Sequence, residues 1–261
     1  MSLNLNFVLG SLPCFILVLV RMVGCISFNP FLGRRNIPFG MRNVLAFFLA
    51  LILTPLQPKG VAMALSTVEL LVGMFKELFI GFCCGFIFTI FYYMIFFICD
   101  IIDMQMGLSM AKVMDPATNI QSSITGMFVS IVYVLFFFAT DCHLVLIKMF
   151  ANSFLVIPPG GAVNFAAIPG FMFGLFASTF SLILKLGLPF IAAELIVEMG
   201  LGILMKLIPQ IHIFVINIQI KILLGLIALI VFAGPISNFL DLYMDTMMKD
   251  VEHALAILGK V

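Results

Sequence analysis

The chain has 261 residues, of which 64% are hydrophobic and only 10% are charged, and its mean hydropathy is +1.28. Soluble domains carry about a quarter charged residues, so this composition is that of an integral membrane protein. The net charge of +1 excludes a strongly basic nucleic-acid-binding surface and a strongly acidic tail.

Neither the cysteines nor the histidines are spaced as metal ligands. The six cysteines form no C-x-x-C pair and are expected to be buried apolar side chains, and the three histidines are scattered. Asp141 and His143 form a close acid–histidine pair, but they lack a third member for a catalytic site. We therefore expect no cofactor, no metal site and no enzymatic activity.

The first apolar run, at residues 7–26, is long enough to cross a membrane and contains Arg21. An arginine there must be paired or must extend to the membrane surface, and its place near the end of the run favours the second. A turn-rich basic loop at 28–42 follows, which the positive-inside rule assigns to the cytoplasm. The next run, at 43–56, is short for a membrane span.

Residues 66–99 are almost continuously apolar, which predicts either one over-long helix or a hairpin broken near Gly73. A single helix of about 34 residues would extend roughly 50 Å, beyond the hydrocarbon thickness. Gly81 and Gly85 have the G-x-x-x-G spacing that favours close packing on another helix.

The stretch from Asp100 to Gln121 is polar and irregular although apolar runs flank it on both sides. It has an Asp-Pro break and four methionines, which are Met104, Met106, Met110 and Met114. Irregular backbone is not tolerated against lipid, so within a membrane this stretch must be shielded by protein or line a cavity. We interpret it as the functional segment, and an ordinary solvent loop between two helices is the alternative.

The following segments predict a helix at 122–139, a polar corner at 140–143 and a short helix at 144–157. The Pro-Pro-Gly-Gly sequence at 158–161 is the strongest break in the chain. Because the chain is membrane-like on both sides of it, we expect one domain over 1–261 with a weak subdivision at 158–161.

The last third begins with an apolar run at 170–188, which Pro189 ends, and a second run that carries Glu194 and Glu198. These glutamates are four residues apart and therefore share one helix face, and Lys206 lies about two turns further along. Inside a membrane they must face protein, water or a cation. We interpret them as structural pairs with a basic partner, and the alternative is an ion or proton relay.

The end of the sequence predicts two more helices. Pro209 and Gln210 turn the chain into an apolar arm at 215–233 that contains Lys221. From Pro235 onward the apolar residues have helical spacing with acidic residues opposite them, which predicts an amphipathic helix at the membrane interface or against a partner.

Several short motifs, weak one by one, are specific in their order and spacing over nearly the whole chain. They are Arg21 with Pro30, Ile37-Pro38 with Arg42, Lys76-Glu77-Leu78 with Gly81 and Gly85, Gln105-Met106-Gly107, Asp115-Pro116, Asp141-Cys142-His143, Glu198-Met199-Gly200-Leu201-Gly202, and Ile208-Pro209-Gln210 with Phe214. In this order the chain resembles the FliR family of flagellar biosynthetic proteins, which is related to the SpaR/YscT-type proteins of injectisomes. Cys142, Lys206 and His212 stand where that family more often has Gly, Arg and Asn.

The resemblance implies an all-α integral membrane protein made of hydrophobic helical hairpins that assembles into a helical export-gate complex. FliR-like proteins join FliP-like and FliQ-like subunits in the bacterial inner membrane, at the flagellar basal body, and act with FlhB-like and FlhA-like export proteins. Unfolded exported proteins are the substrate, and lipid is a further contact, whereas nucleic acid is not. Several helices in the family are lifted out of the bilayer plane, so hydropathy overcounts the true spans.

The resemblance also implies roles for individual residues. The loop between the central helices acts as a pore plug in the family, and methionine side chains there can form a deformable apolar seal that excludes ions. By position the plug or gate residues are Met104, Met106, Gly107, Met110, Met114, Asp115 and Pro116. The residues expected to serve in helix packing or as buried charges are Arg21, Glu77, Gly81, Gly85, Glu194, Glu198, Lys206, Pro209 and Gln210.

A small secondary transporter is the alternative function, with Glu194, Glu198 and Lys206 as its ion-coupling site. Such transporters are commonly built from inverted repeats, which would place matching broken segments in the two halves of the chain. The break at 158–161 has no such counterpart in the first half.

Overall fold

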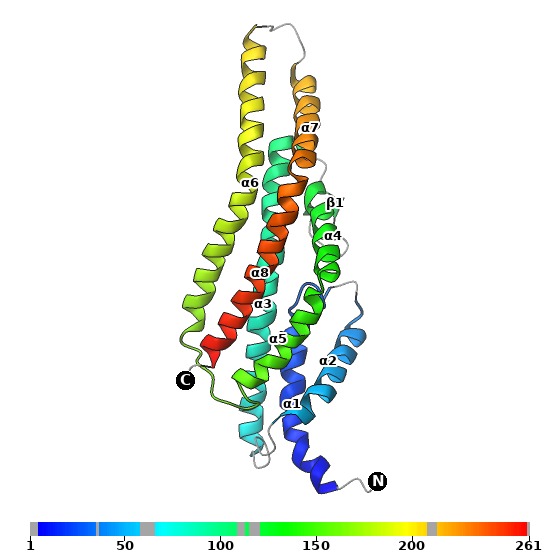
Figure 1. The fold of residues 1–261 in the computed structure, drawn as a ribbon, viewed down its shortest axis with the longest axis vertical. Coiled ribbons are helices and arrows are strands. Elements are labelled where there is room, and N and C mark those ends of the chain that lie inside the picture. Colours follow the sequence, from blue (N-terminus) through cyan, green and yellow to red (C-terminus); the bar gives the residue numbers. More distant parts are fainter. Residues whose placement is uncertain are drawn as a thin grey trace. The chain divides into compact units, whose positions relative to one another are not determined.

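The computed structural model describes residues 5–34, 37–57, 66–108, 113–114, 121–207 and 213–259, and most of these residues are helical. The helices are α1 (Leu5–Ser27), α2 (Phe39–Leu53), the 3-10 helix η1 (Thr54–Leu56), α3 (Thr67–Met106), α4 (Ile124–Ala139), α5 (Cys142–Val156), α6 (Ile168–Leu207), α7 (Ile213–Val231) and α8 (Ala233–Leu258) (Figure 1). Two-residue strands β1 (Val113–Met114) and β2 (Gln121–Ser122) pair antiparallel. The predicted all-α fold is confirmed.

Among the described residues, three helical segments are long and apolar enough to cross a membrane, namely Phe39–Leu56, Thr67–Met106 and Ile168–Leu204. The bent pairs α4–α5 (68°) and α7–α8 (60°) raise this number to five if each pair is one span. The segment predicted as short at 43–56 qualifies because its helix begins earlier, at Phe39, directly after Pro38.

Helices α3 and α6 each run for 40 residues. Of the two alternatives for residues 66–99, the single over-long helix is confirmed and the break near Gly73 is wrong, because α3 continues through Gly73 and packs it against Leu17 of α1. Pro189 does not end a helix either, since it lies inside α6. A proline removes one backbone hydrogen bond, and apolar helices tolerate that loss when the surrounding residues stay paired.

The chain divides into two compact units that each combine several segments. The first unit comprises residues 1–90, 140–175 and 246–261, and the second comprises 91–139 and 176–245. The break at 158–161 lies inside the first unit. The single domain expected over 1–261 stays a prediction.

In the first unit, the backbones of α1 and α3 approach each other closely at glycines. A Cβ atom on Gly81 would lie 2.9 Å from Gly24 Cα and 2.5 Å from the Arg21 carbonyl oxygen. A Cβ atom on Gly85 would lie 2.7 Å from Phe28 Cβ. Larger residues at positions 81 and 85 would therefore separate the two helices.

In the second unit, aromatic side chains form the centre of the core. Tyr243 of α8 donates a hydrogen bond from its hydroxyl to the Phe91 carbonyl oxygen at 2.9 Å, and its ring contacts those of Phe91 and Tyr133. The phenol is fully buried, so this bond satisfies a polar group that water does not reach.

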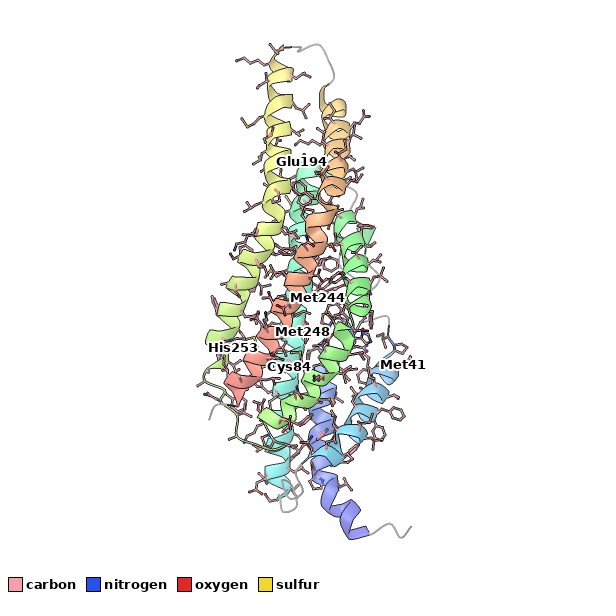
Figure 2. The ribbon with its side chains drawn as sticks, viewed as in Figure 1. Met41, Cys84, Glu194, Met244, Met248 and His253 are labelled. Carbon is pink, nitrogen blue, oxygen red and sulfur yellow. The ribbon has the colours of Figure 1, made fainter. Side chains whose placement is uncertain are left out.

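Helix α8 has the predicted amphipathic pattern. Met244 and Met248 are buried, as are the other apolar residues on their side of the helix (Figure 2). Asp241, Asp245 and Glu252 are exposed on the remaining surface. The prediction of an amphipathic terminal helix is confirmed.

Candidate functional site

A buried ion pair joins α1 to α3 in the first unit. Arg21 is 0% exposed and Glu77 is 1% exposed, and Arg21 Nε donates to Glu77 Oε2 at 2.5 Å. The guanidinium also stacks on Phe154 of α5, whose ring centre is 4.1 Å from Cζ. The expectation that Arg21 extends to the membrane surface is wrong, because α1, α3 and α5 enclose it.

The same pair connects the core to the end of α5 and the turn after it. Arg21 Nη1 donates to the Ser153 carbonyl oxygen at 3.1 Å, and Nη2 donates to the Ile157 carbonyl oxygen at 2.9 Å. Glu77 Oε1 accepts a hydrogen bond of 2.8 Å from the backbone N–H of Gly160. Gly160 has φ +76°, a conformation that glycine adopts without strain. The turn at 158–161 is thus fixed by a buried charge network.

In the second unit, a polar clamp joins the last turns of α3 to the start of α4. Asp103 is fully buried and accepts hydrogen bonds from the Thr125 hydroxyl and from the Thr125 backbone N–H (3.3 Å). Ser123 Oγ accepts a hydrogen bond of 3.1 Å from the Gly126 N–H. These contacts satisfy N–H groups at the helix start that have no partner within the helix.

The central segment between α3 and α4 begins and ends next to the Asp103–Thr125 clamp. α3 ends at Met106, and Gly107 follows with φ +77°, as expected of a residue that terminates a helix. Farther along the segment, β1 and β2 pair Val113 with Ser122 and Met114 with Gln121. We call Met106, Gly107, Ser123 and the Asp103–Thr125 clamp the foot of the segment.

The plug methionines differ in their surroundings where the structure describes them. Met104 is 65% exposed, whereas Met106 is 1% exposed. Met110, Asp115 and Pro116 lie outside the described residues, and only the backbone of Met114 is described. The plug role of these residues stays a prediction.

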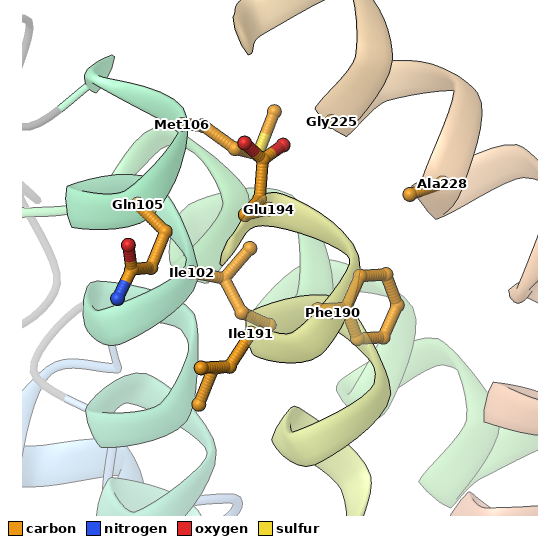
Figure 3. A pocket seen from close by; sticks show the side chains of 8 residues that line it. All are labelled: Ile102, Gln105, Met106, Phe190, Ile191, Glu194, Gly225 and Ala228. Carbon is orange, nitrogen blue, oxygen red and sulfur yellow. The ribbon is translucent and has the colours of Figure 1, made fainter. Parts of the chain in front are cut away.

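A small pocket lies beside the end of α3, where α6 and α7 meet it (Figure 3). Its lining residues are Ile102, Gln105, Met106, Phe190, Ile191, Glu194, Gly225 and Ala228. Glu194 is only 5% exposed, and its Oε2 accepts no hydrogen bond from any described residue. The cavity holds roughly one water molecule and is otherwise apolar except for Gln105.

Glu198 lies one turn beyond Glu194 on α6 and has a basic partner on α7. Lys221 Nζ lies 3.0 Å from Glu198 Oε1. The interpretation of Glu198 as a paired charge agrees with this contact, but the partner is Lys221 and not Lys206, whose side chain is exposed. Pro209 and Gln210 lie outside the described residues.

Sequence reasoning missed three contributors to this region, namely the Asp103–Thr125 clamp, Gly225 and the pairing of Lys221. Ser123 and Thr125 at the start of an apolar run form a helix N-cap signal that identifies the start of α4. A glycine within an apolar helix carries no comparable signal, since glycine is common in membrane helices.

The Glu198–Lys221 pair predicts a charge-swap experiment. Glu198→Lys is expected to lower the stability of the purified chain by up to about 1 kcal/mol, because Glu198 is 54% exposed and the pair is screened. Lys221→Glu in the same chain is expected to restore it, as measured by thermal melting in detergent. Lys206→Glu is the matched control on an exposed lysine and should leave the melting temperature unchanged. Failure of the swap to recover stability would show that the pair contributes nothing.

The sequence matches the family described as "Bacterial export proteins, family 1" over residues 12–247. This chain belongs to that family, the FliR family. It is 30% identical to the flagellar biosynthetic protein FliR of Bacillus subtilis (strain 168), over 98% of this chain and 99% of that protein. It is 27% identical to FliR of Escherichia coli (strain K12), over 92% of this chain and 93% of that protein.

The relatives also include a protein named for the translocation of Yop proteins rather than for flagella. The chain is 24% identical to the Yop proteins translocation protein T of Yersinia pestis, over 94% of this chain and 95% of that protein. The resemblance inferred from short motifs is therefore confirmed. The protein is a membrane-embedded component of a flagellar-type type III export apparatus.

Proposed function

We propose that this protein is a structural and gating subunit of the flagellar export gate in the bacterial inner membrane. With FliP-like and FliQ-like subunits it forms the channel for unfolded substrates, which FlhB-like and FlhA-like proteins help to deliver. Apolar side chains that sister subunits or lipid would cover support this proposal. They include Phe39 and Phe48 of α2, Ile196 of α6, and Ile230 of α7, all of which are exposed.

The observation that carries the gating role is the foot of the central segment. The 40-residue helix α3 and the apolar helix α4 are joined by a segment whose base is held by the buried carboxylate of Asp103 and the buried side chain of Met106. Irregular backbone between such helices must be enclosed by protein or line a water-filled cavity. A segment with a fixed foot and methionines beyond it suits a plug, because the foot holds its position while the apolar side chains deform.

The transporter alternative gains no support from the geometry. Its coupling site requires Glu194, Glu198 and Lys206 to act together. Instead, Glu198 pairs with Lys221, and Glu194 faces the end of α3. The expectation that the protein is not an enzyme stays a prediction.

Replacing residues 109–120 by a short Gly-Ser linker tests the plug. The foot remains intact in this variant, so we expect the complex with its neighbours to assemble while ion leak through it rises several-fold. Conductance of planar bilayers that contain the purified complex measures the leak, and co-purification of the neighbours measures assembly.

A matched pair of variants tests whether the seal depends on apolar side chains or only on the length of the segment. Changing Met104, Met110 and Met114 to Leu keeps an apolar closure and should preserve the seal, whereas changing them to Ser should open it. An assembled complex whose linker variant leaks no more than the parent would exclude the plug role.

A further inference from the structure

Met106 at the end of α3 packs against Gly225 of α7 within the second unit. We call this packing position the seat of Met106. Met106 Cγ and Cε each lie 2.5 Å from the position that a Cβ atom on Gly225 would occupy, and Sδ lies 2.8 Å from it. The methionine side chain therefore packs on the bare backbone of α7, and any side chain at position 225 would displace it. Figure 3 shows Met106 at the pocket that Gly225 and Glu194 also border.

The two sides of the foot are held by different kinds of contact. Asp103 and Thr125 hold the start of α4 with buried hydrogen bonds. Met106 is held by packing, and the carboxylate oxygen Oε2 of Glu194 beside it accepts no hydrogen bond from any described residue. Separating Met106 from its seat thus breaks no polar bond, whereas separating α4 from Asp103 leaves a buried charge without its donors.

We propose that the Met106–Gly225 contact is the latch of the gate and that Gly225 is a positioning residue for the central segment. While the channel is closed, α6 and α7 hold the end of α3 at Met106, from which the central segment continues. Met106 leaves its seat at Gly225 when α6 and α7 shift. A protein that binds α6 and α7 therefore controls the opening of the channel. This proposal rests on the proposed function of the central segment as a plug.

The contact geometry allows the latch to be locked. Since Met106 Cγ is 2.5 Å from the Cβ position at 225, the Cβ atoms of residues 106 and 225 lie within about 4 Å, the separation found in disulfides. A chain with Met106→Cys and Gly225→Cys is therefore expected to form this bond when a mild oxidant removes two electrons and two protons from the thiols. The two single variants, treated with the same oxidant, control for reactions of the native cysteines.

In cells that express the double-cysteine chain, oxidation is expected to stop export of a flagellar substrate, and added reductant is expected to restore it. The yield of the bond reports the contact alone, and the export block reports the latch. A bond that forms while export continues would overturn the proposal, and so would a bond that fails to form in the assembled complex.

A packing variant tests the same contact without oxidation. Gly225→Ala is expected to push Met106 from its seat and raise ion leak several-fold in the assembled complex. Adding Met106→Ala removes the collision and should bring the leak back toward the parent value. Gly187→Ala is the matched control, because its Cβ collides with Ile98 between α6 and α3 of the same unit, about two helical turns before Met106.

These outcomes separate the latch from the plug. Equal leak in the Gly187→Ala and Gly225→Ala complexes would overturn the latch, since loosened packing anywhere in the unit would then suffice. If the linker variant of residues 109–120 does not leak, the plug role fails, while the yield of the 106–225 disulfide still measures the contact.

Discussion

Replacing Arg21 with Leu is expected to prevent stable accumulation of the chain in the membrane. Glu77 is 1% exposed and would be left as a buried charge without its cation. Removing one partner of such a pair typically costs about 3–5 kcal/mol, a large part of the stability of a folded domain. Glu77→Gln is expected to have a similar effect, because the guanidinium would lose its counter-charge. Membrane abundance and thermal melting in detergent measure both.

Two further variants show what the pair contributes beyond its charge. Arg21→Lys keeps the charge but loses the planar fork that reaches Ser153 and Ile157 together, so its stability should fall between those of the parent and Arg21→Leu. Lys76→Gln removes a charge from the neighbouring position of α3 and should leave melting unchanged. If Arg21→Leu melts within a degree or two of the parent (roughly 0.5 kcal/mol for a chain of this size), the pair is not structural.

The helices of this protein could be predicted from the sequence because apolar runs of this length have few alternatives in a membrane. Their ends could not, since Pro38, Gly73 and Pro189 each carry a signal for a break and only Pro38 stands at a helix boundary. Tertiary packing decides these cases. Gly73 fits against Leu17, and α6 continues through Pro189.

The candidate site likewise combines features that could be predicted from the sequence with features that could not. The four-residue spacing correctly placed Glu194 and Glu198 on one helix, but it could not show that one is buried beside Met106 while the other pairs with Lys221. The sequence contains both Lys206 and Lys221, and only the arrangement of α6 and α7 shows that Lys221 is the partner of Glu198. Arg21 illustrates the reverse error. Its position in the run favoured the surface, yet a carboxylate 56 residues later in the sequence holds it inside.

Asp103→Ala is expected to loosen the foot of the central segment while the rest of the chain stays folded. The substitution removes the acceptor that the Thr125 backbone N–H has among the described residues at a buried helix start, and it leaves the Thr125 hydroxyl with the Cys99 carbonyl oxygen at 3.2 Å as its remaining acceptor. Hydrogen bonds to a charged group are worth about 1.5–3 kcal/mol each, so the first turn of α4 should open far more often. Faster hydrogen exchange at residues 124–127 and a raised ion leak would report this opening.

The partner substitution and an exposed aspartate make the test specific to the clamp. Thr125→Val keeps the shape of the side chain but removes the hydroxyl, and it leaves a buried carboxylate short of one donor, so it should reproduce most of the effect. Thr125→Ser keeps the hydroxyl and should preserve the clamp. Asp241→Asn on the exposed face of α8 should change neither exchange nor leak. Because Ser123 still caps the Gly126 N–H in every variant, any change reports Asp103 and Thr125 and not a general loss of the α4 start. Unchanged exchange at residues 124–127 in Asp103→Ala would mean that the capping serine alone holds α4, and the foot would then have no polar clamp.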